Sequence, residues 1–186
     1  GDFDFLFVGD FKFEVIEPLI EKYIGSLKSL DRNDIFIDHN IRRNQNKEYI
    51  EYVEEDSKKA TVIRIYNKEF NYSFKEKIKS RLLFSILDKL LFDEVREKDN
   101  LVYSISASKN FDQKIPIELM SFYTYFNSDP KNVDKIKDKI DLVINKIKTK
   151  DFDLQVFKDQ KLALKNSYKS SLRSNGFWLN VLTDAR

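Results

Sequence analysis

The chain has 186 residues, of which 33 are Lys or Arg, 31 are Asp or Glu, one is His and none is Cys. This length suits one compact domain or two small, closely associated subdomains. A net charge of +2 with 34% charged residues gives no strong field, which disfavours a dedicated binder of nucleic acids or membrane surfaces. The lack of Cys excludes disulfides, thiolate zinc sites and Cys nucleophiles, and the single His excludes any site with two His ligands.

The first part of the chain predicts a strand, a helix and a connector. Apolar and polar residues alternate over 3–8, which is typical of a strand. Apolar residues at helical spacing over 16–24 predict a helix that ends at Gly25, with Pro18 in the first turn, where its missing N–H does no harm. Mixed signals over 26–45 indicate a connector across the surface. Because the chain begins with Gly1 and enters the alternating apolar stretch at once, we expect the natural N-terminus to lie elsewhere and the chain to be a fragment.

The rest of the chain predicts a sheet covered by helices. The predicted elements are strands over 49–53 and 61–66, a long helix over 73–97, strands over 101–108 and 117–126, and helices that start near Pro130 and Asp153, the last of them ended or interrupted at Asn175. This order predicts an α+β fold in which helices pack on one face of a mainly antiparallel sheet. On the long helix, the periodicity predicts burial of Leu82, Leu83, Ile86 and Leu90. No apolar run approaches the roughly 20 residues of a membrane span.

Two groups of polar residues have the wrong pattern for catalysis. His39 has no partners at the spacing of a metal site or triad, so a position in a surface turn is favoured and we assign it no role. The carboxylates of residues 54–56 form a charge run, for which a solvated hairpin loop is favoured over an acid and base pair. The common phosphate-binding and hydrolase motifs are absent.

One pair of residues is a better candidate for a role in catalysis or substrate binding. Arg96 lies near the end of the predicted long helix, and Tyr103 lies seven residues later on the next predicted strand. A guanidinium and a phenol are both hydrogen-bond donors suited to a peptide carbonyl or its developing oxyanion. Structural roles are also open, since Tyr103 shares a predicted strand face with Ile105 and Arg96 could interact with the carbonyls at the helix C-terminus. On local physics alone these structural roles are favoured.

Four stretches of the sequence, in this order, resemble a known family. They read FLFVGDF at 5–11 followed by IEPLIEKYIGSL at 16–27, LLFDEVREKDNLVYS at 90–104, FNSDPKNV at 126–133 and NGFW at 175–178. Together they resemble segments of the pitrilysin/insulinase-type zinc metallopeptidases, an inverzincin family, with the strongest likeness to bacterial zinc proteases. The resemblance covers nearly the whole chain.

The resemblance implies a protein of two homologous halves that close like a clamshell, each built from two α+β domains. It implies that residues 1–30 are the end of the preceding domain or a linking strand and helix. Residues 31–186 would be the C-terminal α+β domain, truncated at its C-terminal end. The zinc-binding H-x-x-E-H motif belongs to the N-terminal half of the family and is absent here. The implied cofactor is therefore zinc in the full-length protein and none in this fragment.

The resemblance also implies roles for the pair described above. Tyr103 matches the Tyr that helps to stabilise the tetrahedral intermediate, and Arg96 matches the Arg that holds the substrate backbone. The implied function is the C-terminal, non-zinc-binding region of a zinc metalloendopeptidase, inactive alone. Its implied partners are the N-terminal catalytic half of the same protein and peptide substrates, in the bacterial periplasm or cytoplasm.

Two alternatives remain. The first is a non-catalytic scaffold or partner subunit of the same fold, and an H-x-x-E-H motif upstream in the full gene would decide against it. The second is a weak nucleic-acid binder that uses the Lys-rich helices, which is disfavoured because acidic residues are interleaved throughout.

Overall fold

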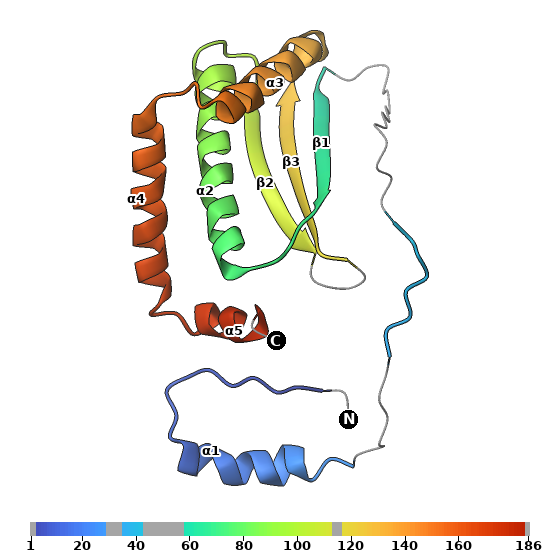
Figure 1. The fold of residues 1–186 in the computed structure, drawn as a ribbon, viewed down its shortest axis with the longest axis vertical. Helices are drawn as coiled ribbons and strands as arrows, with labels where there is room; N and C mark the ends of the chain where they lie inside the picture. The colour runs from blue at the N-terminus through green and yellow to red at the C-terminus, as the bar shows by residue number, and fades with distance from the viewer. Residues whose placement is uncertain (1–2, 29–34, 43–57, 113–116, 185–186) are drawn as a thin grey trace. The chain divides into compact units, whose positions relative to one another are not determined.

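The computed structural model describes residues 3–28, 35–42, 58–112 and 117–184 (Figure 1). The contacts divide the chain into two compact units, Arg42–Leu164 and a smaller one made of Gly1–Ile41 and Lys165–Arg186. The strand expected over 49–53 and the charge run at 54–56 lie outside the described residues, and so does the expected domain boundary at residue 30, which stays a prediction.

A three-stranded antiparallel sheet is the centre of the larger unit. Its strands are β1 (Ala60–Glu69), β2 (Ser104–Asp112) and β3 (Leu119–Ser128), in the spatial order β1-β3-β2. This arrangement confirms the predicted antiparallel pairing of the strands. The start of β2 differs from the prediction, because pairing begins at Ser104 opposite Asn127. Tyr103 therefore precedes the strand and does not follow its alternation of faces.

Two helices cover one face of this sheet. They are α2 (Phe74–Leu91), which continues into the π-helix η2 (Phe92–Glu97), and α3 (Val133–Thr149), which follows the short 3-10 turn η3 (Pro130–Asn132) (Figure 1). Asp129 caps η3 as predicted, because its carboxylate accepts a hydrogen bond from the Lys131 N–H at 3.1 Å. At the start of α2 the Ser73 hydroxyl accepts one from the Glu76 N–H at 3.2 Å. These caps explain where α2 and η3 begin.

The core lies between these helices and the sheet. Its fully buried apolar side chains come from both the helices and the sheet, namely Leu91, Val95, Phe126, Ile136, Ile140 and Val143. On the sheet, the Phe122 ring stacks on Tyr66, with centroids 4.3 Å apart, and lies 5.3 Å from the Phe84 ring of α2. Because Phe122 touches both a neighbouring strand and a helix, it joins the two layers.

The buried face of α2 is partly as predicted. Ile86 and Leu90 are buried and Leu82 is half-buried, but Leu83 is 42% exposed, so its predicted burial is wrong. The helix α3 crosses near the C-terminal end of α2 (Figure 1). Helical periodicity marks a stripe of apolar residues, whereas the position of the covering helix decides how much of that stripe is buried.

Towards the two ends of the chain, the structure differs from the sequence prediction at two places and settles an open alternative at a third. Residues 3–8 have no regular structure, because alternation alone does not supply the paired backbone that a strand needs. Pro18 lies beyond the first turn, since the helix α1 (Phe13–Ile20), extended by the π-helix η1 (Glu21–Gly25), starts earlier than predicted. Asn175 begins the helix α5 (Asn175–Asp184) after α4 (Leu154–Ser171) has ended, which settles the alternative left open there.

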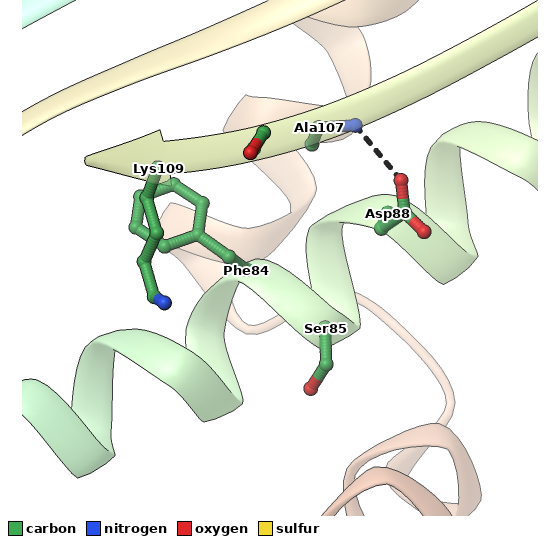
Figure 2. A pocket seen from close by; sticks show the side chains of 6 residues that line it. Phe84, Ser85, Asp88, Ala107 and Lys109 are labelled. Carbon is green, nitrogen blue, oxygen red and sulfur yellow. Dashed lines mark hydrogen bonds between the residues drawn. The ribbon is translucent and has the colours of Figure 1, made fainter. Parts of the chain in front are cut away.

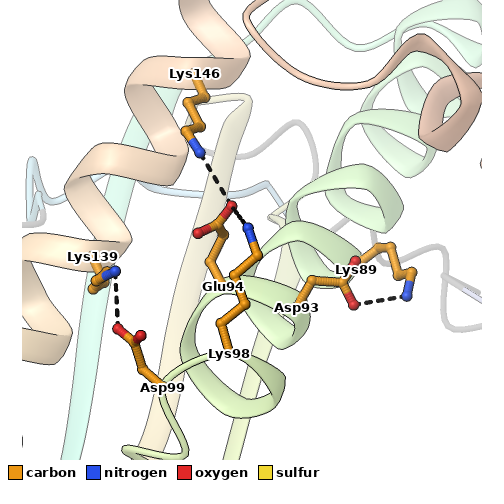
Figure 3. A network of polar contacts seen from close by, with 7 residues as sticks. All are labelled: Lys89, Asp93, Glu94, Lys98, Asp99, Lys139 and Lys146. Atoms are coloured by element: carbon orange, nitrogen blue, oxygen red, sulfur yellow. Dashed lines mark hydrogen bonds and ion pairs between the residues drawn. The ribbon is translucent and has the colours of Figure 1, made fainter.

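Ion pairs connect the segment after α2 to α3. The Glu94 carboxylate, only 14% exposed, lies 2.8 Å from the Lys98 Nζ and 3.1 Å from the Lys146 Nζ, and Asp99 pairs with Lys139 at 2.9 Å (Figure 3). The hydrogen bond from Lys98 lowers the pKa of Glu94 below its ordinary value of 4.5; desolvation opposes this shift, and Lys146 adds to it. Two carboxylates of this segment are thus held against α3.

We predict that Ile86→Ala lowers the free energy of unfolding by about 2–5 kcal/mol, because Ile86 is buried and its truncation leaves a cavity. Leu83→Ala is the control on the same helix and should cost no more than about 1 kcal/mol, because Leu83 is already largely in water. Urea titration of both variants measures the difference. Equal losses would show that the buried face of α2 is assigned incorrectly.

We also predict that Glu94→Gln lowers the free energy of unfolding by about 1 kcal/mol near pH 7, because it removes the charge that two ammonium groups share. The folded-state pKa of Glu94 is lowered, so its stabilisation is complete above the unfolded value of 4.5 and is lost as pH falls through the folded pKa. The difference between wild type and variant should therefore shrink in acid.

The matched control is Asp138→Asn, which removes one negative charge from an exposed position on α3. It should change stability little at any pH. Denaturant titrations at several pH values give both curves, and a Glu94→Gln deficit that persists unchanged in acid would contradict the assigned ion pairs.

Candidate functional site

Arg96 lies on η2, where the helix is wound as a π-helix, a rare geometry that is often found at functional sites. Its side chain is exposed, and its guanidinium carbon lies 4.9 Å from the centroid of the Phe92 ring, four residues earlier. This cation–π contact replaces the suggested contact with carbonyls at the helix end. Within the described ranges the guanidinium has no hydrogen bond, so its N–H donors are available.

Tyr103 lies in the bend that precedes β2, and it is 64% exposed. Its backbone N–H donates to the Asn127 carbonyl at 3.0 Å, which attaches the bend to β3. The neighbouring core positions belong to Val102 and Ile105, which are 6% and 8% exposed. The alternative in which Tyr103 is a core aromatic is therefore wrong, because the bend interrupts the strand alternation on which that alternative depended.

A tight turn brings together the segments that carry these two residues. The Leu101 N–H donates to the Val95 carbonyl at 3.2 Å, and the Asn100 N–H donates to the Arg96 carbonyl at 3.1 Å. Asn100 adopts a left-handed conformation with φ of 50°, which Asn tolerates better than most residues. Among the described residues no hydrogen bond or cation–π contact joins the two side chains; the Arg96 guanidinium lies over the Phe92 ring instead.

A polar network fixes the end of the sheet beside Tyr103. The Asn127 side chain accepts a hydrogen bond from the Thr61 hydroxyl at 2.6 Å and donates to the Tyr125 hydroxyl at 2.7 Å. It also donates to the Ser104 hydroxyl at 3.4 Å. The network therefore connects all three strands. Sequence reasoning did not find Asn127, because its partners are adjacent only through the strand register.

One positive charge lies near the Tyr103 ring. The Lys59 Nζ is 5.8 Å from the ring centroid. The pKa of Lys131 is raised first by the hydrogen bond and charge of Asp129, 3.0 Å away, and last by Tyr103. These lysines were not identified from the sequence either. A phenol donor in positive surroundings can stabilise an oxygen that gains negative charge.

The described residues do not form a metal centre. Within the described ranges, no three or more side chains of the ligand types His, Cys, Asp and Glu come together as a metal site would require. His39 lies exposed in a segment without regular structure. None of the helices in the described part of the chain is long and apolar enough to cross a membrane.

Comparisons with known proteins agree with this architecture. The chain is similar to the periplasmic protease PqqL from Escherichia coli, whose crystal structure superposes with a TM-score of 0.75 at 18% identity. The match covers 95% of this chain and 19% of that chain, so this chain spans about a fifth of the protease. At this identity the likeness shows the fold alone, and it confirms the predicted α+β class. No curated protein matches the sequence.

The family comparison covers most of the chain. The model of the Peptidase M16 inactive domain matches residues 1–164. This match confirms the resemblance to the pitrilysin/insulinase-type peptidases; of the sequence stretches that indicated it, NGFW at 175–178 lies beyond the matched residues. The chain belongs to the family of Peptidase M16 inactive domains.

Proposed function

We propose that this chain is the C-terminal, non-zinc-binding region of a zinc metalloendopeptidase, where it forms part of the chamber wall and contacts peptide substrates. Its membership of a family of inactive peptidase domains supports a non-catalytic part of such a protease. The observation that carries the substrate contact is the exposed Tyr103 beside Lys59. Core packing does not explain a large aromatic residue that is mostly in water beside a cation.

Tyr103 would act on the scissile carbonyl. Its phenol O–H donates a hydrogen bond to the carbonyl oxygen, which gains negative charge as the tetrahedral intermediate forms. The neighbouring ammonium group of Lys59 favours that charge over the neutral ground state. The hydrogen bond therefore strengthens towards the transition state, which is what lowers the barrier.

Arg96 would hold the substrate backbone. Its guanidinium presents several donors in a planar fork, which suits the carbonyl oxygens of an extended peptide. Stacking on Phe92 restricts the side chain, so less conformational entropy is lost when substrate binds. Because this contact exists before and during the reaction, it contributes to binding more than to the chemical step.

The zinc of the full-length protein would be bound by the N-terminal half, because the donors described here do not form a metal site. Bound zinc supplies the activated water of such enzymes. This chain would contribute positioning and charge, with the N-terminal half and peptide substrates as partners. The periplasmic location of the similar protease supports the periplasm as the compartment.

We predict that the isolated chain hydrolyses no peptide and binds no stoichiometric zinc, because a catalytic zinc normally takes three protein ligands. Metal analysis after chelator washing and a fluorogenic peptide assay test the two parts. One tightly held zinc per chain would show that this region forms a metal centre of its own.

In the full-length enzyme we predict that Tyr103→Phe lowers kcat by roughly 10²–10³, the usual effect of removing one oxyanion donor. Tyr23→Phe is the matched control, because Tyr23 is also 64% exposed and also has a lysine over its ring. It should leave kcat unchanged. A scaffold or partner subunit of the same fold would show no loss with either variant.

Arg96→Lys distinguishes the two proposed roles within the same kinetic assay. It should mainly raise KM, because Lys keeps the charge and loses the planar fork. An equal fall in kcat and kcat/KM with KM unchanged would instead place Arg96 in transition-state stabilisation.

A further inference from the structure

A second candidate site lies at the other end of β2. A cleft of about 220 Å³ opens between α2 and β2 and is lined by Phe84, Ser85, Asp88, Ala107, Ser108 and Lys109 (Figure 2). Lys109 lies six residues after Tyr103, which corresponds to about 20 Å along an extended strand. The cleft is therefore separate from the site proposed around Tyr103.

Lys109 lines this cleft, and two cations of α2 act on it. Lys109 is half-buried, and its pKa is lowered first by desolvation and then by the charges of Arg81 and Lys77. Arg81 and Lys77 are four residues apart on α2, so they share a helix face with Ser85 and with the cleft. Among the described residues no carboxylate pairs with Lys109 or Arg81; the Lys109 ammonium lies 5.4 Å from the Phe111 ring.

This concentration of charge does not stabilise the fold. Partial burial of an ammonium group near like charges disfavours its charged form, which is the physical cause of the lowered pKa of Lys109. Asp88 is the one carboxylate that lines the cleft, and it accepts a hydrogen bond from the Ala107 N–H at 2.8 Å. A bound anion would relieve the repulsion, so the cleft is electrostatically complementary to a carboxylate.

The strand edge at the cleft adds a second kind of contact. The Ala107 N–H points away from β3, since it donates to Asp88 on α2. Backbone groups two residues apart on a strand have the same orientation, so the N–H and C=O of Lys109 also point to the edge. Within the described ranges nothing pairs with that N–H. An extended peptide pairing there would place the side chain opposite Lys109 on the same face as the Lys109 ammonium.

We propose that the cleft between α2 and β2 binds an acidic side chain of an extended peptide, with Lys109 and Arg81 pairing its carboxylate and the Lys109 backbone pairing its main chain. The partner is a peptide segment because an isolated anion would use the cations and leave the strand edge unpaired. The proposal is independent of the catalytic roles of Tyr103 and Arg96.

The test uses the whole 186-residue chain and two fluorescent eight-residue peptides, one alternating Glu and Val and the other alternating Gln and Val. Alternation places all Glu side chains on one face of an extended peptide. Fluorescence anisotropy at low salt should show that the Glu peptide binds about tenfold more tightly than the Gln peptide. Equal affinities would overturn the proposal.

Variants locate the binding. Lys109→Gln should abolish the preference for Glu, Arg81→Gln should reduce it, and Lys109→Arg should retain it, which also controls for loss of folding. Lys75→Gln is the matched control, because it removes one positive charge from an exposed position on α2 that does not act on Lys109. A Lys75→Gln loss as large as that of Lys109→Gln would show only diffuse attraction and would overturn the proposal.

Backbone pairing has its own test. A Glu and Val peptide methylated on alternate backbone nitrogens keeps every side chain but loses the donors that face the strand edge. Its affinity should fall by about tenfold, whereas an unchanged affinity would overturn the strand pairing. Inorganic phosphate is the probe for a simple anion site. If it binds in a Lys109-dependent way while the Glu peptide does not, the site takes free anions and the proposal is wrong.

Discussion

Burial of two valines, one on each side of the turn after α2, is the constraint on which the site depends. Val95 is fully buried and precedes Arg96, and Val102 is 6% exposed and precedes Tyr103. Neighbouring side chains point in different directions, so a residue beside a buried valine is directed towards the surface. The hydrophobic core thus orients both proposed functional side chains without contacting either of them.

The charged residues of the larger unit have two contrasting environments. In the segment after α2, Glu94 and Asp99 are paired with lysines of α3, and these pairs hold the turn against the core. At the end of β2, Lys109 stays near other cations without an acidic partner among the described residues. Paired charges stabilise a local structure modestly, whereas unpaired, partly desolvated charges are costly unless a ligand neutralises them. This contrast distinguishes supporting charges from candidate binding charges.

In the larger unit, the sequence predicted where helices and strands lie better than it predicted which of their residues are buried. Periodicity and capping residues such as Asp129 locate α2, α3 and β1, because these signals are local. The exposure of Leu83 and the outward position of Tyr103 depend on where a helix crosses and where a strand begins to pair. The partners of Asn127 follow from the register of three strands. Such long-range relations are not contained in any local pattern.

A blocked strand edge, as well as distance, separates the candidate site at Tyr103, just before β2, from the one at Lys109 on β2. Strand pairing at Lys109 could extend towards Tyr103 only through the outward N–H of Ala107, and Asp88 already accepts the hydrogen bond from that group. A side-chain carboxylate that occupies an edge donor blocks continuous addition of a strand, as charged groups at sheet edges commonly do. A peptide bound at Lys109 therefore cannot continue in register along β2 to Tyr103 unless Asp88 is displaced. A substrate of the proposed site at Tyr103 would therefore arrive from another direction, and the two proposed sites would be occupied or lost independently.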